Sequence, residues 1–307
     1  MTSAKSESAK FIKRYRVDAP ASFRLRSIDC ADTGDLDKDD AQSMLAGDVK
    51  QLADLQARLY AEDRWSLLIV LQGMDAAGKD SVVAHVMSGV NPQGCEVHSF
   101  KHPSAEELDH DFLWRAAPRL PARGRIGIFN RSYYEDVLVV RVRPGLLQQQ
   151  KLPESLIGKS IWEERFQDIR AFERHLARSG TRVLKFFLHL SKEEQRRRFL
   201  DRLDDPAKRW KFSMDDVTER KRWDQNMAAY EEMIRSTSTP AAPWHVVPAD
   251  HKWFTRLVVA SAVIEALESL QLAFPKVGAA DLKELRKVRK ALEAEKPSGG
   301  KLRHRRD

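Results

Sequence analysis

The chain has 307 residues, of which 42% are hydrophobic and 8% aromatic, and a formal net charge of +8 at pH 7. This composition is typical of a globular protein with a sizeable core and excludes a small fold that depends on disulfides. With only Cys30 and Cys95, the chain has neither a disulfide framework nor a four-ligand zinc site, and we expect a reducing, cytoplasmic compartment. We expect no signal peptide, and three charged residues interrupt the apolar stretch 254–272, so we expect no membrane segment.

The positive charge is concentrated at the C-terminus. Residues 276–307 contain eleven Lys and Arg against five Asp and Glu, a net of +6, which leaves +2 for the rest of the chain. A polyanionic partner must therefore be bound by local clusters of the body rather than by its overall field. The basic tail is more typical of a solvated helix with a frayed end than of a binding arm.

Apolar runs of strand length alternate with helical patterns, which predicts an α/β fold with a parallel sheet covered on both faces. Residues 1–45 are polar and predict an arm on the surface, before a helix over 40–62. The predicted strands are, in chain order, Ser66–Gln72, Glu96–Phe100, Arg125–Asn130, Thr181–Leu190 and Trp244–Pro248. Further helices are predicted over 79–88, 104–114, 191–202 and 251–272, the second and third opening with a Ser/Glu capping box.

The segment Gly73-Met-Asp-Ala-Ala-Gly78-Lys79 has the spacing of a phosphate-binding P-loop and stands between an apolar strand and a helix start. Gly73 and Gly78 let backbone N–H groups turn inward around phosphate oxygens, and the helix N-terminus adds positive potential. Lys79 is expected to neutralise the outer phosphates. A purely structural glycine turn is the weaker alternative, because a strand of this quality precedes the motif.

Asp80 stands where P-loops usually carry a Ser or Thr that contacts Mg²⁺. Asp75 offers a carboxylate that can hold the metal instead, directly or through water, since Mg²⁺ prefers one or two carboxylates plus phosphate oxygens. Asp80 is then a further group of the phosphate site or, as we prefer, an ordinary first-turn carboxylate favoured by the helix dipole.

A second polar loop, Asn130-Arg131-Ser-Tyr-Tyr-Glu135-Asp136, follows the third predicted strand, at the edge where open α/β sheets bind ligands. Asp136 is the expected second metal ligand, and Glu135 is either a neighbour of the metal or a nucleotide contact. Arg131 is expected to stabilise charge on a transferred phosphoryl group, because its planar fork suits phosphate oxygens. The alternative is that Arg131 and Asp136 merely pair on a surface helix.

A third set of positive charges runs from Arg196 to Lys211. Consecutive arginines in a helix point in different directions, so only some can face a site, and a solvated helix laced with salt bridges is the alternative for each. As a whole the cluster favours a lid over about 195–225, because phosphoryl transfer depends on positioning, charge neutralisation and exclusion of water. The candidate phosphate contacts in this segment are Arg198, Lys208, Arg209 and Lys211. Lys101, which follows the second predicted strand, is a further candidate.

Several separate segments, in the same order, resemble the polyphosphate kinase 2 family, and together they span residues 40–272. They are GMDAAGKD at 73–80, NPQG at 91–94, SFKHPS at 99–104, LDHDFLWR at 108–115, FNRSYYEDVLVVRV at 129–142, DDPAKRWKFS at 204–213 and RKRWDQ at 220–225. This set is far more specific than a P-loop alone.

The resemblance implies a three-layer α/β/α P-loop kinase-like domain over 46–275, with a helical basic lid that includes Lys208, Arg209 and Lys211. It implies dependence on Mg²⁺, for which Mn²⁺ is a candidate substitute, and reversible phosphoryl transfer between inorganic polyphosphate and a nucleotide. By similarity, Asp75 and Lys79 are the metal and phosphate residues of the first loop. A homo-oligomer, dimer or tetramer, is also implied.

Many members of that family carry Asp at the position of Asn130 and Asn at the position of Glu135. The combination Asn130, Glu135 and Asp136 resembles the subgroup that phosphorylates both monophosphates and diphosphates, so AMP and ADP are the preferred acceptors. GMP and GDP stay open as further acceptors. The Asn at position 130 is the reason that Asp136 is taken as the second metal ligand.

Two other functions are weighed against this one. An ATP-dependent nucleoside monophosphate kinase would share the P-loop, the arginine-rich helix and the lid, and would differ in needing a base pocket for its donor. A nucleic-acid binder would use the basic tail and clusters, but no known nucleic-acid module is visible and the body is near neutral. We therefore expect neither nucleic acid nor a membrane as partner.

Overall fold

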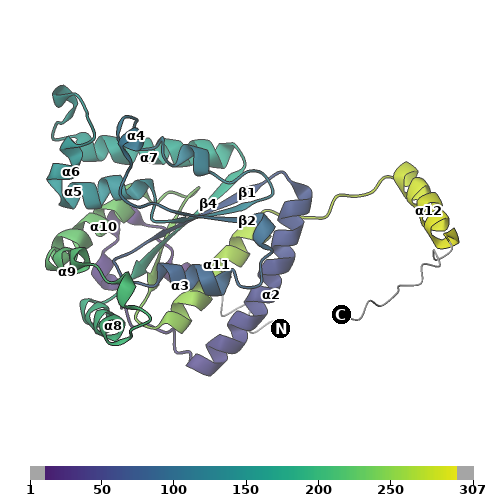
Figure 1. Ribbon diagram of the computed structural model, residues 1–307, viewed down its shortest axis with the longest axis horizontal. Helices are drawn as coiled ribbons and strands as arrows, with labels where there is room; N and C mark the ends of the chain where they lie inside the picture. The colour runs from purple at the N-terminus through teal and green to yellow at the C-terminus, as the bar shows by residue number, and fades with distance from the viewer. Residues whose placement is uncertain (1–10, 296–307) are drawn as a thin grey trace, which may run out of the picture. The chain divides into compact units, whose positions relative to one another are not determined.

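Five strands form one parallel sheet at the centre of the computed structural model, which describes residues 11–295. Their spatial order is β2-β3-β1-β4-β5 (Figure 1). Because all neighbours are parallel, every strand presents its carboxyl end at the same edge of the sheet. The strands are β1 (Ser66–Gln72), β2 (Cys95–Ser99), β3 (Ile126–Asn130), β4 (Thr181–His189) and β5 (Trp244–Pro248), which confirms the five predicted strands to within a residue.

Helices cover both faces of the sheet, as the sequence predicts (Figure 1). Alternate residues of β1 point to opposite faces: Leu67 and Ile69 pack in one buried cluster, Leu68 and Val70 in the other. The first cluster is closed by α2 (Lys38–Glu62), α3 (Lys79–Val86) and α11 (Lys252–Glu268), and the second by α7 (Ile161–Arg178) and α10 (Trp223–Thr237). The three-layer α/β/α architecture is therefore confirmed.

Shorter helices lie at the edge of the sheet where the strands end. Among residues 11–295, no helix is both long and apolar enough to cross a bilayer. Further elements include α4 (Ala105–Leu108), α5 (Val139–Val142), α6 (Pro144–Gln148), α8 (Lys192–Asp204), α9 (Met214–Lys221), and the 3-10 helices η5 (Tyr133–Val137) and η7 (Arg209–Lys211).

The N-terminal segment differs from the predicted surface arm. Residues 11–15 are helical, and Phe11, Ile12 and Tyr15 are buried in the first cluster. The rings of Phe11 and Tyr15 meet Phe254 of α11 edge to face, with centroids 5.7 and 5.9 Å apart. Five residues are too few to show a period in the sequence, and their contacts come from a helix more than 200 residues away. Residues 1–10 of the predicted arm lie outside the described part of the chain.

The helix predicted over 104–114 is also shorter than expected. Its capping box is present, since Ser104 and Glu107 bond each other's backbone N–H groups, but α4 ends at Leu108. The Asp111 carboxylate then accepts from the N–H of Leu113 at 2.9 Å, a local bond that competes with the helical ladder.

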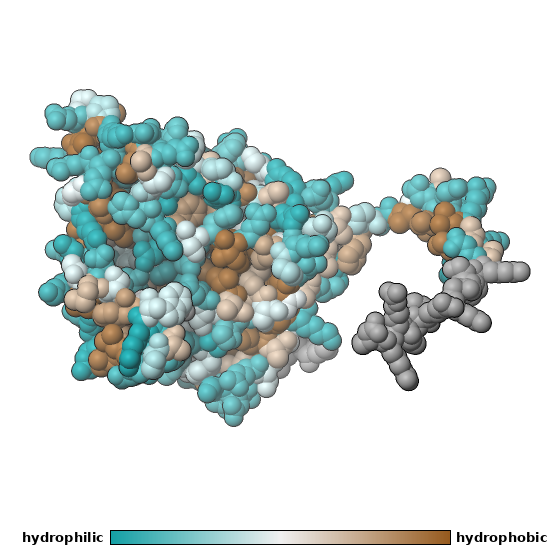
Figure 2. All heavy atoms as spheres, viewed as in Figure 1, coloured by the Kyte–Doolittle hydropathy of each residue, from teal (hydrophilic) through white to brown (hydrophobic). Residues whose placement is uncertain are grey.

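The basic tail forms a unit of its own from Phe274, and it contains α12 (Ala279–Ala294). Residues 296–307 of the predicted tail lie outside the described residues. Along α12 the apolar side chains lie on one stripe and are exposed, as the brown spheres on this helix show (Figure 2). They are Leu282, Leu285, Val288 and Leu292.

Candidate active site

The P-loop connects β1, the middle strand, to α3, at the carboxyl edge of the sheet. Gly78 caps α3 with φ of 108°, a conformation that residues with a side chain rarely adopt. A Cβ at Gly73, whose φ is 154°, would lie 3.0 Å from the backbone oxygen of Leu188. Both glycines are therefore required by the conformation of the loop itself.

The Lys79 side chain is buried and folds back over the loop. Its ammonium donates to the carbonyl oxygens of Gly73 at 2.7 Å and Met74 at 3.2 Å. Burial, helped by the neighbouring charge of Arg131, lowers the pKa of Lys79 to about 8. Lys79 is thus a desolvated cation that an incoming phosphate would stabilise in its charged form.

The second polar loop begins where β3 ends, beside β1, since Leu71 and Asn130 are register partners. Arg131 adopts φ of 62° and pairs with Asp75 of the P-loop. Its guanidinium also lies 3.6 Å from the Glu135 carboxylate, and these two acids raise the pKa of Arg131 further above its usual value. The structure therefore brings the two predicted loops together through the pair of Asp75 and Arg131.

Asp136 does not pair with Arg131, so the alternative of a simple surface ion pair is wrong. Its carboxylate accepts from the Gln150 amide at 2.5 Å and lies 3.9 Å from Arg165 of α7. Burial raises the pKa of Asp136 to about 6, against the opposing effect of Arg165. Glu135, also desolvated, has a pKa raised above its usual value. Both carboxylates face the same cavity.

A buried polar network holds this second loop in place. Tyr133 and Tyr134 of η5 both donate to one oxygen of Glu173 on α7, at 2.9 and 2.7 Å. Lys185 of β4 donates to the other oxygen at 2.6 Å, to the Tyr134 hydroxyl at 2.9 Å and to the Thr237 carbonyl at 2.8 Å. Because η5 is too short to hold its own shape, its two tyrosines anchor the residues that carry Glu135 and Asp136.

A cavity of about 330 Å³ lies between the two loops and helices α5, α6 and α9. Its apolar side chains suit a nucleoside, and its four cationic side chains suit phosphates, while six carboxylates also line it. The apolar residues are Met74, Phe100, Pro103, Leu108, Val139, Val140 and Leu146. The charged ones are Asp75, Lys101, Arg115, Arg131, Glu135, Asp136, Arg143, Asp215, Asp216 and Glu219.

The predicted site residues Asn130 and Asp80 bond each other: the Asn130 amide donates to the Asp80 carboxylate at 2.6 Å. The two loops are thus joined a second time, on the α3 side. Asp80 is therefore not only a first-turn carboxylate favoured by the helix dipole. It also orients the side chain of Asn130.

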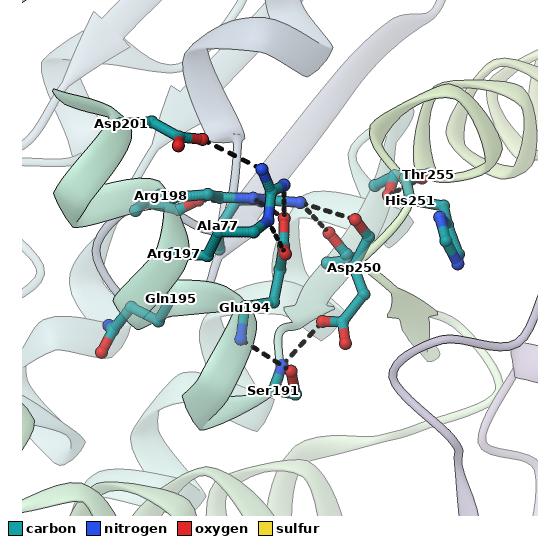
Figure 3. A network of polar contacts seen from close by, with 12 residues as sticks. Ala77, Ser191, Glu194, Gln195, Arg197, Arg198, Asp201, Asp250, His251 and Thr255 are labelled. Carbon is teal, nitrogen blue, oxygen red and sulfur yellow. Dashed lines mark hydrogen bonds and ion pairs between the residues drawn. The ribbon is translucent and has the colours of Figure 1, made fainter. Parts of the chain in front are cut away.

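The arginines of α8 diverge, as helical geometry requires. Arg196 pairs with Glu193 at the surface, and Arg197 lies outside with Glu194 and Asp201. Arg198 points inward and reaches the backbone of the P-loop (Figure 3). Unlike the prediction of a phosphate contact, its N–H groups are directed at carbonyl oxygens, and it does not line the cavity.

Two of the predicted lid cations, Lys208 and Arg209, do not line the cavity. Lys208 pairs with Asp205 at 2.5 Å, and Arg209 donates to the Leu203 carbonyl at 2.7 Å; both are exposed. The side chain of Lys211 lies outside what the structure describes. Lys101, in contrast, lines the cavity as predicted.

Several residues that line the cavity or contact its lining carry no recognisable signal in the sequence. Gln150 and Arg165 reach Asp136 from a loop and from α7, and Arg143 is held by Glu219 of α9 at 2.6 Å. Each belongs to a segment without a motif, so only folding brings it to the site.

One carboxylate of the P-loop fits a magnesium ion. Asp75 lines the cavity beside the P-loop and offers the single carboxylate that Mg²⁺ needs when phosphate oxygens supply other ligands. Within residues 11–295 no three His, Cys, Asp or Glu side chains form a metal cage of their own. Asp75 therefore fits a shared metal site, and Asp136 lines the same cavity; one oxygen of each is already bonded, to Arg131 and to Gln150 respectively.

Comparison with known proteins agrees with this geometry. The family model of polyphosphate kinase 2 matches residues 35–275. The ADP-polyphosphate phosphotransferase of Rhodopseudomonas palustris is 53% identical over 256 residues, which are 83% of this chain and 89% of the relative. The AMP/ADP-polyphosphate phosphotransferase of Meiothermus ruber is 46% identical over 86% of this chain and 96% of its own.

Among solved structures, polyphosphate kinase 2 from Arthrobacter aurescens TC1 superposes with a TM-score of 0.83 at 40% identity. The match covers 91% of this chain and 96% of that one. Because the family model and close relatives cover most of the chain, this protein belongs to the polyphosphate kinase 2 family.

Proposed function

We propose that the protein transfers the terminal phosphoryl group of inorganic polyphosphate to AMP and ADP, forming ADP and ATP, and that the reaction is reversible. The observation that carries this proposal is the junction of the P-loop and the second loop, through Asp75 and Arg131, at the mouth of a cavity of nucleotide size. The names of the two relatives, ADP- and AMP/ADP-polyphosphate phosphotransferase, support the same donor and acceptors.

Different residues of the chain bind the phosphate donor and the nucleotide acceptor. The P-loop N–H groups and Lys79 bind the end of the polyphosphate, and the cavity holds the nucleotide with its phosphates toward Arg131. An oxygen of the acceptor phosphate attacks the terminal phosphorus of the donor. The bond to the next phosphate breaks, and the shortened chain leaves with the electron pair. The acceptor oxygen is already anionic, so no general base is needed.

Arg131 neutralises charge on the transferred group, and its bonds to Asp75 and Glu135 hold its fork in position beforehand. A bound Mg²⁺, held through Asp75 and the phosphates, would supply further charge neutralisation; Asp136 is the second candidate ligand, and Mn²⁺ the alternative ion. Water is excluded when the helical lid closes, which is the proposed role of Lys208, Arg209 and Lys211.

The test is a nucleotide product assay. The purified full chain is mixed with Mg²⁺ and polyphosphate, with AMP, ADP, GMP or GDP supplied in turn, and the products are separated. ADP and ATP are expected from AMP, and ATP from ADP; the guanine reactions decide whether the acceptor pocket accepts a second base. If no nucleoside diphosphate or triphosphate forms, the proposal fails. A parallel reaction with ATP as donor to AMP, and no polyphosphate, tests the monophosphate kinase alternative.

Binding of inorganic tripolyphosphate should weaken as the pH rises through about 8. The pKa of Lys79 is lowered to about 8 by burial and by Arg131, against the opposing charges of Asp75, Glu135 and Asp80, so above that pH its positive charge is lost. Calorimetric Kd values on both sides of this pH measure the effect. In Lys79→Arg the charge persists, and the weakening should disappear; an equal pH dependence in both proteins would contradict this assignment.

Removing residues 277–307 should raise the KM for long polyphosphate several-fold and leave kcat with tripolyphosphate unchanged. The reason is that residues 276–307 hold +6 of the +8 net charge, and only long chains extend beyond the P-loop. A chain that keeps α12 but replaces its five Lys and Arg by Gln should behave in the same way. Equal KM values for long chains in the parent and both variants would remove this role.

We further propose that the protein is a cytoplasmic homo-oligomer, a dimer or tetramer, without nucleic acid or membrane partners. The two reduced cysteines and the family membership support this. Light scattering on the purified full chain measures the assembly.

A further inference from the structure

Arg198 is the buried member of the three consecutive arginines in α8. Its side chain is 5% exposed, whereas those of Arg196 and Arg197 are 58% and 60% exposed. All three pair with glutamates of the first turn of the helix. Charge alone therefore does not distinguish them, but position does.

The inner edge of the Arg198 guanidinium bonds the P-loop. One terminal nitrogen donates to the carbonyl oxygens of Ala76 at 2.9 Å and Ala77 at 3.1 Å. A peptide unit is planar and trans, so its N–H points opposite to its C=O. Holding the Ala77 carbonyl toward Arg198 turns the N–H of Gly78 the other way, into the phosphate-binding turn. Ala76 has φ of 65°, a costly conformation for alanine that these bonds help to maintain.

The outer edge of the same guanidinium ties this turn to the end of β5. The second terminal nitrogen donates to the carbonyl oxygens of Ala249 at 2.6 Å and Asp250 at 2.9 Å, just before α11 (Figure 3). The Nε donates to Glu194 at 2.7 Å. The five N–H groups of the guanidinium thus meet five acceptors, and none is left for a phosphate.

A second contact of α8 reinforces this arrangement. The Gln195 amide donates to the backbone carbonyl of Asp75 at 3.0 Å. The Asp250 carboxylate accepts from the N–H of Ser191 at 2.8 Å (Figure 3). The helix that begins the lid segment therefore donates hydrogen bonds to three successive carbonyl oxygens of the P-loop, those of Asp75, Ala76 and Ala77.

We infer that Arg198 is a positioning residue for the P-loop: it holds the peptides after Ala76 and Ala77 so that the Gly78 N–H faces the donor phosphate, and it does not bind phosphate itself. The inference rests on the proposed function for the identity of the donor, but the geometry concerns any phosphate that the loop binds. A lysine cannot replace it, because one ammonium with three N–H groups cannot reach acceptors on both sides of the fork.

The variants Arg198→Lys and Arg197→Lys provide a matched comparison. Both keep the charge, and both arginines pair with Glu194, but only Arg198 contacts the P-loop. Arg198→Lys should weaken calorimetric binding of inorganic tripolyphosphate about tenfold or more and lower kcat by a similar factor, with the KM for AMP unchanged. Arg197→Lys should match the parent in all three.

The salt dependence of binding separates positioning from direct contact. Loss of a direct phosphate contact lowers the slope of log Kd against log salt concentration, whereas a misplaced backbone leaves that slope unchanged. Arg198→Gln is the variant for this measurement, since it removes the charge. An unchanged slope with weaker binding supports the inference. A shallower slope, or parent-like binding in Arg198→Lys, overturns it.

If Arg198→Lys is not recovered folded, Glu194→Ala is the second variant. It removes the acceptor that holds the Nε and with it the orientation of the fork toward Ala76 and Ala77, so a smaller loss of tripolyphosphate affinity is expected, and parent-like affinity counts against the inference. Failure of the parent to make ATP from polyphosphate would reject the proposed function alone, since tripolyphosphate binding is measured separately.

Discussion

Replacing Lys79 by methionine should lower kcat by about three orders of magnitude while the fold stays intact. Methionine keeps the length and apolar stem of the side chain and removes the ammonium that caps the Gly73 and Met74 carbonyls. The charge is lost at the point where phosphoryl transfer concentrates negative charge, and no other lysine is close enough in the loop to replace it. Initial rates of ATP formation from ADP and polyphosphate measure the effect.

The matched control is Lys50→Met, at an exposed position of α2, a helix that contributes no residue to the cavity. It makes the same chemical change and should keep the parent's rate. Both variants should unfold at the parent's temperature to within a few degrees. A Lys79→Met enzyme that retains a tenth or more of the parent's kcat would show that the P-loop lysine is not the main cation of the reaction.

Replacing Glu173 by alanine should lower the free energy of unfolding by about 3–5 kcal/mol, because breaking a buried ion pair leaves an uncompensated charge. Lys185 and Glu173 are 0% and 1% exposed, and both oxygens of Glu173 are bonded. The two tyrosine hydroxyls of η5 would lose their acceptor at the same time. Urea unfolding, followed by circular dichroism, measures the change.

A double variant tests whether the uncompensated charge is the cause. Glu173→Leu with Lys185→Met removes both charges and fills their volume, so its stability should recover most of the loss, since apolar replacements of buried pairs are often neutral. Its kcat should nevertheless stay below the parent's, because Tyr133 and Tyr134 no longer have the carboxylate that anchors the second loop. A double variant as unstable as Glu173→Ala would point to lost packing instead.

The parts of this protein that could be predicted from the sequence are those governed by local chemistry. The apolar run Ser66–Gln72 specifies a buried strand in any context, and the spacing of Gly73, Gly78 and Lys79 specifies the turn that follows it. Parallel strands share one edge, so Arg131 and Asp136 were expected near that turn. Both line the cavity with Gly73 and Asp75.

The partners of these residues depend on distant segments and could not be predicted. Arg131 pairs with Asp75 of the P-loop rather than with Asp136, and Asp136 contacts Gln150 of a loop and Arg165 of α7, because the fold brings these separate segments together. No local pattern encodes such a contact.

The arginines of α8 show most clearly what local sequence determines and what tertiary packing determines. Helical periodicity states that Arg196, Arg197 and Arg198 point in three directions, but the direction of the protein interior is a property of the packed sheet. The end of β5 and the back of the P-loop meet beside Arg198, so this arginine is buried against five acceptors while its neighbours stay in water. Local sequence specifies the elements and the loop chemistry, and long-range packing assigns each charged side chain its partner.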